Sequence, residues 1–138
     1  MALSARYLAD KSALARFRHP AVGERLGPLL EDGWIATCGI VDLEVLYSAR
    51  SLGDYETTLQ ERRSLEEVPI TPEVIARAID IQHGLARRGQ HRVPIPDLLI
   101  AAAAESADLT VLHYDSDFEL IAQLSDLAQE WVVPRSAS

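Results

Sequence analysis

Residues 94–105 read PIPDLLIAAAAE, a helix opening followed by a run without a polar side chain. Pro96 suits the first turn of a helix, because the amide hydrogen that proline lacks has no partner there. From Leu98 to Ala104 the helix has no polar face, and the next charged side chain is Glu105. A helix that is apolar all round is found inside a protein rather than on its surface. The segment therefore predicts a helix that its neighbours bury.

Short apolar runs alternate with helical patterns on both sides of this segment. Asp54 and Thr71 are suitable N-caps for two of the helices, and Gly89 ends the second of them. This alternation favours a parallel sheet that helices cover on both faces. We expect strands over residues 7–9, 34–37, 68–70, 109–114 and 131–133, and helices over residues 12–17, 20–30, 40–49, 54–65, 72–88, 96–105 and 118–124.

The chain has 138 residues, the usual size of one domain. We expect a single domain over residues 1–138, with loose ends at residues 1–5 and 135–138. No apolar run reaches the ~18 residues that a bilayer span needs, which argues against membrane contact. The N-terminus has no secretion-signal pattern, so we expect a cytoplasmic protein. The one cysteine, Cys38, lies in an apolar stretch and is expected to be a buried structural thiol.

The formal charge of −8 is unusual for a protein that binds nucleic acid, because contacts to phosphates need Lys and Arg. It argues against tight, sequence-blind binding to duplex DNA. Two facts weaken the objection: carboxylates that hold a metal are neutralised, and the basic residues cluster. The clusters are Arg16, Arg18, His19 and Arg25, and then Arg87, Arg88, His91 and Arg92.

Several acids occupy positions that propensity alone does not explain. Asp10 ends the first expected strand, and Asp115 and Asp117 follow the strand over residues 109–114. Because the carboxyl ends of parallel strands meet at one edge of a sheet, we expect these acids to lie together. Acids at strand ends also form turns, and the residues alone leave that alternative open.

Three further acids belong to helices. Asp97 lies in the first turn of the apolar helix, where a negative charge stabilises the helix by about 0.3–1 kcal/mol even if it belongs to no functional site. Glu44 and Asp42 lie about 200° apart around the helix over residues 40–49, at ~100° per residue, and both have apolar neighbours. One of them should face solvent and the other a polar site, and periodicity does not choose between them.

Convergence of these acids would require a counter-ion. Two carboxylates ~4 Å apart repel by ~4 kcal/mol at an effective dielectric constant of about 20. Such a cluster needs a divalent cation or a captured proton. Oxygen ligands without a Cys or His pair favour Mg²⁺ or Mn²⁺ over zinc. Beside arginines, such an ion can activate water and stabilise a phosphate, which predicts phosphodiester cleavage.

Four segments, taken in order, resemble the motifs of PIN domains. Residues 7–14, YLADKSAL, resemble the opening strand that ends in Asp-x-Ser, and residues 37–49, TCGIVDLEVLYSA, are similar to the second motif. Residues 94–102, PIPDLLIAA, and residues 112–118, LHYDSDF, resemble the third and fourth. Each segment alone is weak evidence for the family. Together they span nearly the whole chain, and the closest likeness is to the VapC-like toxins of type II toxin–antitoxin pairs.

The resemblance implies a three-layer α/β/α sandwich around a short, mainly parallel sheet. It also implies a Mg²⁺-dependent endoribonuclease in which a metal-activated water cleaves RNA and leaves a 5′-phosphate, and it selects Glu44 over Asp42. Ser12 matches the hydroxyl that supports the first aspartate. The implied metal and catalytic residues are Asp10, Glu44, Asp97 and Asp115, with Asp117 as an accessory metal ligand.

The resemblance further implies a homodimer and a cognate antitoxin, whose tail lies over the active-site groove and presents an Arg to the acids. Two departures from the family pattern leave the acids intact: Lys11 stands where a small residue is common, and His113 and Tyr114 where Thr is common. We expect His113 to be a structural histidine rather than a general base. Candidate RNA contacts are Lys11, Arg16, Arg18, Arg87 and Arg88, although Arg87 and Arg88 would also complement a helix dipole.

Two other functions remain open at this point. A metal-dependent phosphatase or phosphotransfer domain could use a similar sheet, but a phosphoryl receiver needs a late Lys, and the only lysine is Lys11. A non-catalytic PIN-fold module that binds RNA or an antitoxin is the second alternative, and the complete set of acids argues against it.

Overall fold

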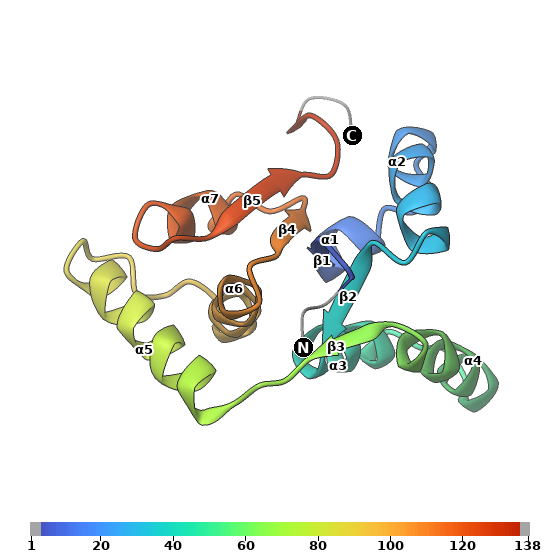
Figure 1. Ribbon diagram of the computed structural model, residues 1–138, viewed down its shortest axis with the longest axis horizontal. Helices are drawn as coiled ribbons and strands as arrows, with labels where there is room; N and C mark the ends of the chain where they lie inside the picture. The colour runs from blue at the N-terminus through green and yellow to red at the C-terminus, as the bar shows by residue number, and fades with distance from the viewer. Residues whose placement is uncertain (1–3, 136–138) are drawn as a thin grey trace.

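Five strands form a parallel sheet in the order β3-β2-β1-β4-β5 in the computed structural model, which describes residues 4–135 (Figure 1). Each pair of neighbouring strands is parallel, so the expected parallel sheet is confirmed. β1 lies at its centre, where Ala9 pairs with Leu112. The strands are β1 Tyr7–Ala9, β2 Ile35–Cys38, β3 Glu66–Val68, β4 Thr110–His113 and β5 Ala128–Trp131.

Helices connect the strands in the alternation that the sequence predicts. They are α1 Lys11–Leu14, α2 Pro20–Glu31, α3 Gly39–Tyr47, α4 Leu52–Arg63, α5 Pro72–Ala86, α6 Ile95–Ser106 and α7 Asp117–Ala122. Thr71 caps α5, because its side chain accepts a hydrogen bond from the amide of Val74. Gly89 follows α5 with a φ of 71°, a left-handed conformation that glycine adopts without strain.

A hydrophobic core lies on each face of the sheet. Leu8 belongs to the larger core, with residues of α3, α5, α6 and α7, whereas Ala9 belongs to the smaller core with α1 and α2. Successive residues of a strand point to opposite faces, so these two cores make three layers. The expected three-layer sandwich is therefore confirmed. Leu98 and residues 100–104 are buried in the larger core, as expected for α6, and so is Cys38.

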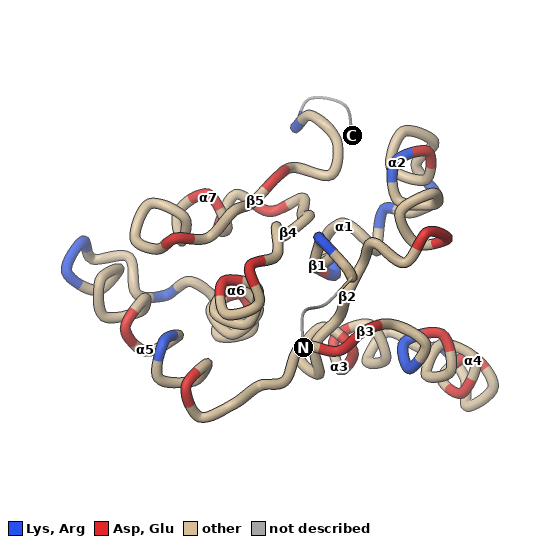
Figure 2. Tube along the Cα trace, in the orientation of Figure 1, with Lys and Arg blue, Asp and Glu red and all other residues tan. Residues whose placement is uncertain are grey.

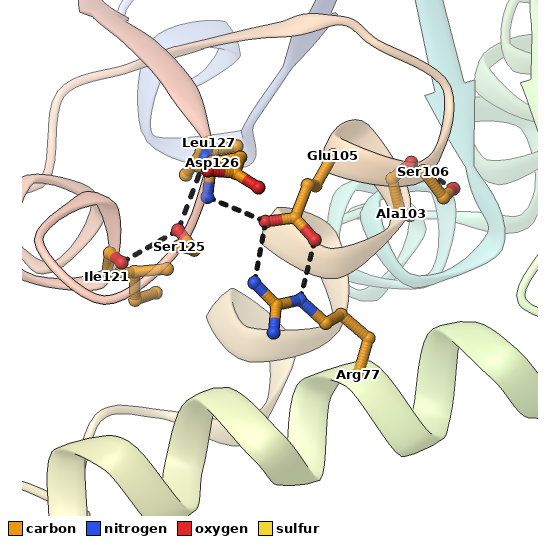
Figure 3. A network of polar contacts seen from close by, with 8 residues as sticks. All are labelled: Arg77, Ala103, Glu105, Ser106, Ile121, Ser125, Asp126 and Leu127. Atoms are coloured by element: carbon orange, nitrogen blue, oxygen red, sulfur yellow. Dashed lines mark hydrogen bonds and ion pairs between the residues drawn. The ribbon is translucent and has the colours of Figure 1, made fainter.

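An ion pair anchors the C-terminal end of α6 (Figure 3). Arg77 on α5 donates from Nε and Nη2 to the two carboxylate oxygens of Glu105, at 2.6 and 3.1 Å. The same carboxylate accepts the amide N–H of Asp126, in the loop before β5, at 2.9 Å. The hydrogen bond from Arg77 lowers the pKa of Glu105. This network holds α6 against α5 and that loop, and so fixes the helix that carries Asp97.

Two strand predictions are displaced. The third strand is Glu66–Val68 and not residues 68–70, because Pro69 has no amide hydrogen to donate to a neighbouring strand. The last strand is Ala128–Trp131 and not residues 131–133. The apolar residues Val132 and Val133 come after it and pack into the smaller core, whereas β5 itself is an edge strand without a continuous apolar run.

The start of α4 differs from the prediction by two residues. α4 begins at Leu52, and its N-cap is Ser51, whose hydroxyl accepts the amide N–H of Asp54 at 3.0 Å. Asp54 is therefore in the first turn rather than at the cap. A serine hydroxyl and an aspartate carboxylate are similarly good caps, so sequence alone placed the start too late.

The expected loose ends are outside the described residues at positions 1–3 and 136–138. Ser4 and Ala5 contradict the prediction, because their amide N–H groups donate to the Glu66 carboxylate at 3.2 and 2.8 Å and Ala5 is buried. Arg135 lies over the ring of Trp131, and its carbonyl accepts a hydrogen bond from the Tyr114 hydroxyl. Within residues 4–135, no helix is long and apolar enough to cross a membrane.

A buried ion pair ties α4 to the sheet. Arg62 is the buried residue of this otherwise polar helix, and it donates from Nε to Asp42 at 2.8 Å and from Nη2 to the Thr37 hydroxyl at 2.7 Å. The Thr37 hydroxyl in turn donates to Asp42 at 2.8 Å. The three side chains come from α4, α3 and β2, so the pair sets the position of α3.

Replacing Arg62 with Leu leaves the carboxylate of Asp42 without its charged partner. We expect the free energy of unfolding to fall by about 3 kcal/mol, the lower end of the range for breaking a buried pair. Urea denaturation measures the change. The control is Arg63→Leu, one residue further on the exposed face, where a change within about 0.5 kcal/mol is expected. Equal effects of the two substitutions would show that the pair has no anchoring role.

Candidate active site

A cleft of about 280 Å³ lies at the edge of the sheet where the strands end. It is lined by Asp10, Lys11, Ser12, Ala15, Glu44, Pro94, Asp97 and Asp115. Asp10 follows β1 and Asp115 follows β4, and these two strands are paired neighbours. The prediction that these acids share one edge of the sheet is confirmed. Four carboxylates that are far apart in sequence meet in this cleft.

Asp10 and Asp97 are buried at the start of helices. Asp10 is the N-cap of α1, where its Oδ2 accepts the amide N–H of Ser12 at 2.9 Å. Asp97 is in the first turn of α6, whose N-cap is Pro94, so Asp97 does not cap the helix. A helix N-terminus favours negative charge, which helps to keep two acids in a buried place.

Three carboxylate oxygens in the cleft are buried and lack a hydrogen-bond partner among the described residues. They are Oδ1 of Asp10, Oε1 of Glu44 and Oδ2 of Asp97. A buried acceptor without a partner is costly, and a buried charge more so. Oxygens from three separate elements of the fold therefore fit a cation that takes oxygen ligands, such as Mg²⁺ or Mn²⁺.

Asp117 extends the cluster from the start of α7. One oxygen from each of Asp97, Asp115 and Asp117 lies within 4.8 Å of the others. The amide N–H of Asp117 donates to Oδ1 of Asp115 at 2.9 Å, which holds this turn together. The five sequence-predicted acids thus lie at one end of the sheet.

The cluster disfavours ionisation of its members. The pKa of Asp97 rises from 3.8 to about 8, first because of burial and then because of the charges of Asp10, Asp115, Asp117 and Glu44. Burial and the charge of Asp10 raise the pKa of Glu44, and the charge of Lys11 opposes this. Burial and the charge of Asp115 raise the pKa of Asp117. Like charges in a low dielectric produce such shifts, and a divalent cation removes their cause.

The structure separates Glu44 from Asp42 on α3. Asp42 bonds to Arg62 and Thr37, away from the cleft, whereas Glu44 lines the cleft. The expectation that one of them faces a polar site holds for Glu44. The expectation that the other faces solvent is wrong, because the Asp42 carboxylate is largely buried against Arg62 and Thr37. Sequence alone did not identify Arg62 as the partner of Asp42, because the two are 20 positions apart.

Ser12 supports both strand ends. Its amide N–H donates to Asp10, while its hydroxyl accepts the amide N–H of Tyr114 at 2.8 Å. We expected the Ser12 hydroxyl to support Asp10, but it is the backbone N–H of Ser12 that bonds to the Asp10 carboxylate. The hydroxyl instead joins the segment after β1 to the segment after β4.

Lys and Arg residues are spread over several elements of the fold (Figure 2), and the five candidate RNA-contact residues differ in their contacts. Lys11 lines the cleft itself. Arg16 is next to it, since it donates to the Ser12 carbonyl at 3.2 Å and lies 4.1 Å above the ring of Tyr114. Arg18 is exposed in the turn before α2. Arg87 and Arg88 follow α5, where Arg88 donates to Gln123 at 2.9 Å.

His113 is a second residue whose contacts sequence reasoning missed. It is fully buried, as expected of a structural histidine, and burial lowers its pKa. Its Nδ1 accepts the amide N–H of Asp115 at 3.1 Å, and its Nε2 lies 2.6 Å from Oε1 of Gln129. The position of His113 two residues before an acid was visible in the sequence. The role of Gln129 was not visible, because its edge strand has no continuous apolar run that would have predicted a strand there.

The raised pKa of Asp97 predicts a stability that falls with pH in metal-free protein. Between 3.8 and about 8 the folded state keeps a proton on this carboxyl that the unfolded state has lost, so stability falls as pH rises through that range. We expect Asp97→Asn to raise the melting temperature by a few degrees at pH 8 in EDTA and by little near pH 4.

Calorimetry at the two pH values measures this difference. Mg²⁺ should stabilise the wild-type chain and have a much smaller effect on Asp97→Asn. The control is Asp80→Asn on the exposed face of α5, which should change neither value. If Asp97→Asn were less stable than wild type at pH 8, charge repulsion at Asp97 would not be the dominant effect.

Comparisons with known proteins agree with this geometry. The family model described as PIN domain matches residues 7–124. Ribonuclease VapC21 of Mycobacterium tuberculosis is 50% identical over 133 residues, which cover 95% of this chain and 96% of that protein. Ribonuclease VapC51 of the same organism is 42% identical over 132 residues, 96% of each chain.

Solved structures share the fold at low sequence identity. VapBC2 from Rickettsia felis, bound to a DNA fragment from its promoter, aligns with a TM-score of 0.72 at 19% identity, over 90% of this chain and 96% of that one. VapBC from Salmonella typhimurium, also bound to DNA, aligns with a TM-score of 0.71 at 21% identity, over 94% and 99%. Because the PIN-domain model matches most of the chain and two VapC ribonucleases are 42–50% identical to it, the chain belongs to the PIN-domain family, in its VapC branch.

Proposed function

We propose that this chain is a Mg²⁺-dependent endoribonuclease that serves as the toxin of a type II toxin–antitoxin module. The observation that carries the proposal is the set of three buried, unpartnered carboxylate oxygens on Asp10, Glu44 and Asp97. These oxygens line one open cleft, beside a lysine that can contact a phosphate. The relatives at 42–50% identity are named ribonucleases, which supports the same reaction here.

Asp10, Glu44, Asp97 and Asp115 would hold the ion, with Asp117 beside them, and Mn²⁺ has the same ligand preference. When bound, Mg²⁺ lowers the pKa of water and stabilises negative charge on a phosphate. The protein supplies the rest of the site. The N-termini of α1 and α6 orient Asp10 and Asp97, and Lys11 offers a positive charge to the RNA backbone.

The central test is cleavage of a structured RNA by the purified chain in Mg²⁺. We expect internal cuts with 5′-phosphate ends, and no cuts in EDTA. Asp97→Asn should lower the rate by at least about 100-fold, as when one charge-stabilising group is removed from other enzymes. Asp80→Asn is the matched control and should cleave like wild type.

Three outcomes of this assay would contradict the proposal. Cleavage that persists in EDTA, or in Asp97→Asn, would show that the cluster is not the catalytic centre. Tight RNA binding without cleavage would favour a non-catalytic module. Release of phosphate from monoesters without internal cuts would indicate a phosphatase.

Lys11 should contribute to RNA binding through a phosphate. In an Asp97→Asn background, which prevents cleavage, Lys11→Gln should weaken RNA binding for all sequences alike. It should also reduce the slope of log K against log salt by about 1, because one fewer counter-ion is released. Fluorescence anisotropy at several salt concentrations measures both effects. Arg63→Gln, on the exposed face of α4, is the matched control and should leave the slope unchanged. An unchanged slope in Lys11→Gln would exclude the contact.

The same function implies a protein partner. The structural neighbours are VapBC complexes, which supports a cognate antitoxin for this chain. An antitoxin that presents an Arg to the acids would pair with carboxylates that are otherwise unpartnered. Where a small reading frame adjoins this gene, its co-expression with the chain tests the proposal, and recovery of the chain alone would count against it. We also propose that the chain acts in the cytoplasm, where an endoribonuclease meets RNA.

A homodimer is also part of the proposal. An apolar groove of about 420 Å³ lies between α3, α5 and α6. It includes Ile79 and Ile95, which are 59% and 65% exposed, unusually high for isoleucine in one groove. A second copy of the chain would cover these side chains. Sedimentation analysis of wild type and Ile79→Asp tests this, and a wild-type monomer at all concentrations would exclude it.

A further inference from the structure

We propose that His113 is a positioning residue for Asp115, and that its buried imidazole does this as the tautomer with hydrogen on Nε2. In this role the ring holds the backbone of Asp115 so that the carboxylate lies with the other acids. The inference rests on the proposed function, since it is there that Asp115 is assigned to the metal site. His113 itself would touch neither metal nor RNA.

The imidazole of His113 is immobilised on several sides. The side chain is fully buried, and its ring centroid lies 5.1 Å from that of Phe118 and 5.0 Å from that of Trp131. Nε2 lies 2.6 Å from Oε1 of Gln129 on the neighbouring strand. A ring held in this way offers a hydrogen-bonding group at one fixed place.

The tautomer follows from the partners of the two ring nitrogens. The backbone amide of Asp115 can only donate, so Nδ1 must be the unprotonated nitrogen that accepts at 3.1 Å. The ring hydrogen is therefore on Nε2, where it donates to the amide oxygen of Gln129. A doubly protonated ring would set Nδ1–H against the N–H of Asp115. The hydrogen-bond pattern thus selects one neutral form.

This bond acts where regular pairing of β4 ends. The carbonyl of His113 still accepts the amide N–H of Val132, and the next two amides, of Tyr114 and Asp115, donate to side chains instead. Each of these amides is thereby oriented before the chain enters α7. The carboxylate of Asp115 then accepts the amide of the residue two positions later and has an oxygen within 4.8 Å of those of Asp97 and Asp117.

NMR of the metal-free wild-type chain tests the tautomer directly. Nitrogen-15 spectra of the histidine rings should show Nδ1 of His113 unprotonated and Nε2 protonated, with a coupling across the hydrogen bond from Nδ1 to the amide nitrogen of Asp115. A protonated Nδ1 would overturn the proposal. This measurement needs neither metal nor RNA.

Three variants test the positioning role by titration with Mg²⁺ alone. His113→Leu removes the acceptor nitrogen and keeps an apolar side chain. We expect a loss of roughly 10- to 100-fold in Mg²⁺ affinity, the usual effect of removing a group that orients a metal ligand. His113→Asn should recover most of that loss, because an asparagine oxygen accepts the amide N–H two residues later in a turn. Gln129→Leu is the matched control, since it removes the other bond of the ring and leaves Nδ1 in place.

The outcomes separate positioning from packing. If Gln129→Leu lowers Mg²⁺ affinity as much as His113→Leu, or if His113→Asn gives no recovery, the ring is only a packing group and the proposal fails. If wild type neither binds Mg²⁺ nor cleaves RNA, the proposed function fails. In that case the tautomer and the Asp115 amide coupling still decide whether His113 orients this residue.

Discussion

Mutual repulsion of carboxylates at one edge of the sheet is the constraint on which the rest of the structure depends. Asp10, Glu44, Asp97 and Asp115 line one cleft, and three of them have a buried oxygen without a partner among the described residues. At an effective dielectric constant of about 20, two such charges ~4 Å apart repel by ~4 kcal/mol, a large fraction of a domain's stability. The fold must therefore hold these side chains together against a force that separates them.

Charged residues elsewhere in the described chain are paired where they are buried, and this supplies the necessary rigidity. Glu105, at the end of α6 away from the cleft, bonds to Arg77 on α5, and Asp42 on α3 bonds to Arg62 on α4. Each pair fixes a helix whose other acid faces the cleft: Asp97 on α6 and Glu44 on α3. Both helices thus carry one acid that an arginine compensates and one with a buried oxygen that has no hydrogen-bond partner among the described residues.

Some of these features could be predicted from sequence, and others depend on contacts between distant parts of the chain. The shared edge of Asp10 and Asp115 follows from parallel strands alone, and the burial of α6 follows from its apolar run. The choice of Glu44 over Asp42 needed either family resemblance or knowledge of Arg62, which lies on another helix. The last strand was misplaced because the apolar run at Val132 suggested a strand, whereas that run packs beneath the sheet after β5 ends.

One kind of local hydrogen bond occurs three times at the cleft: a side chain accepts the backbone N–H of the residue two positions later. The acceptors are the carboxylates of Asp10 and Asp115 and the imidazole of His113, which accepts the amide N–H of Asp115. Asp10 uses one oxygen to shape its own backbone and keeps the other without a partner among the described residues. Asp115 is shaped from both directions, because its amide is bound as well as its carboxylate. Because these hydrogen bonds fix its backbone, Asp115 is held beside like charges, and the fold itself assembles the carboxylates of the cleft.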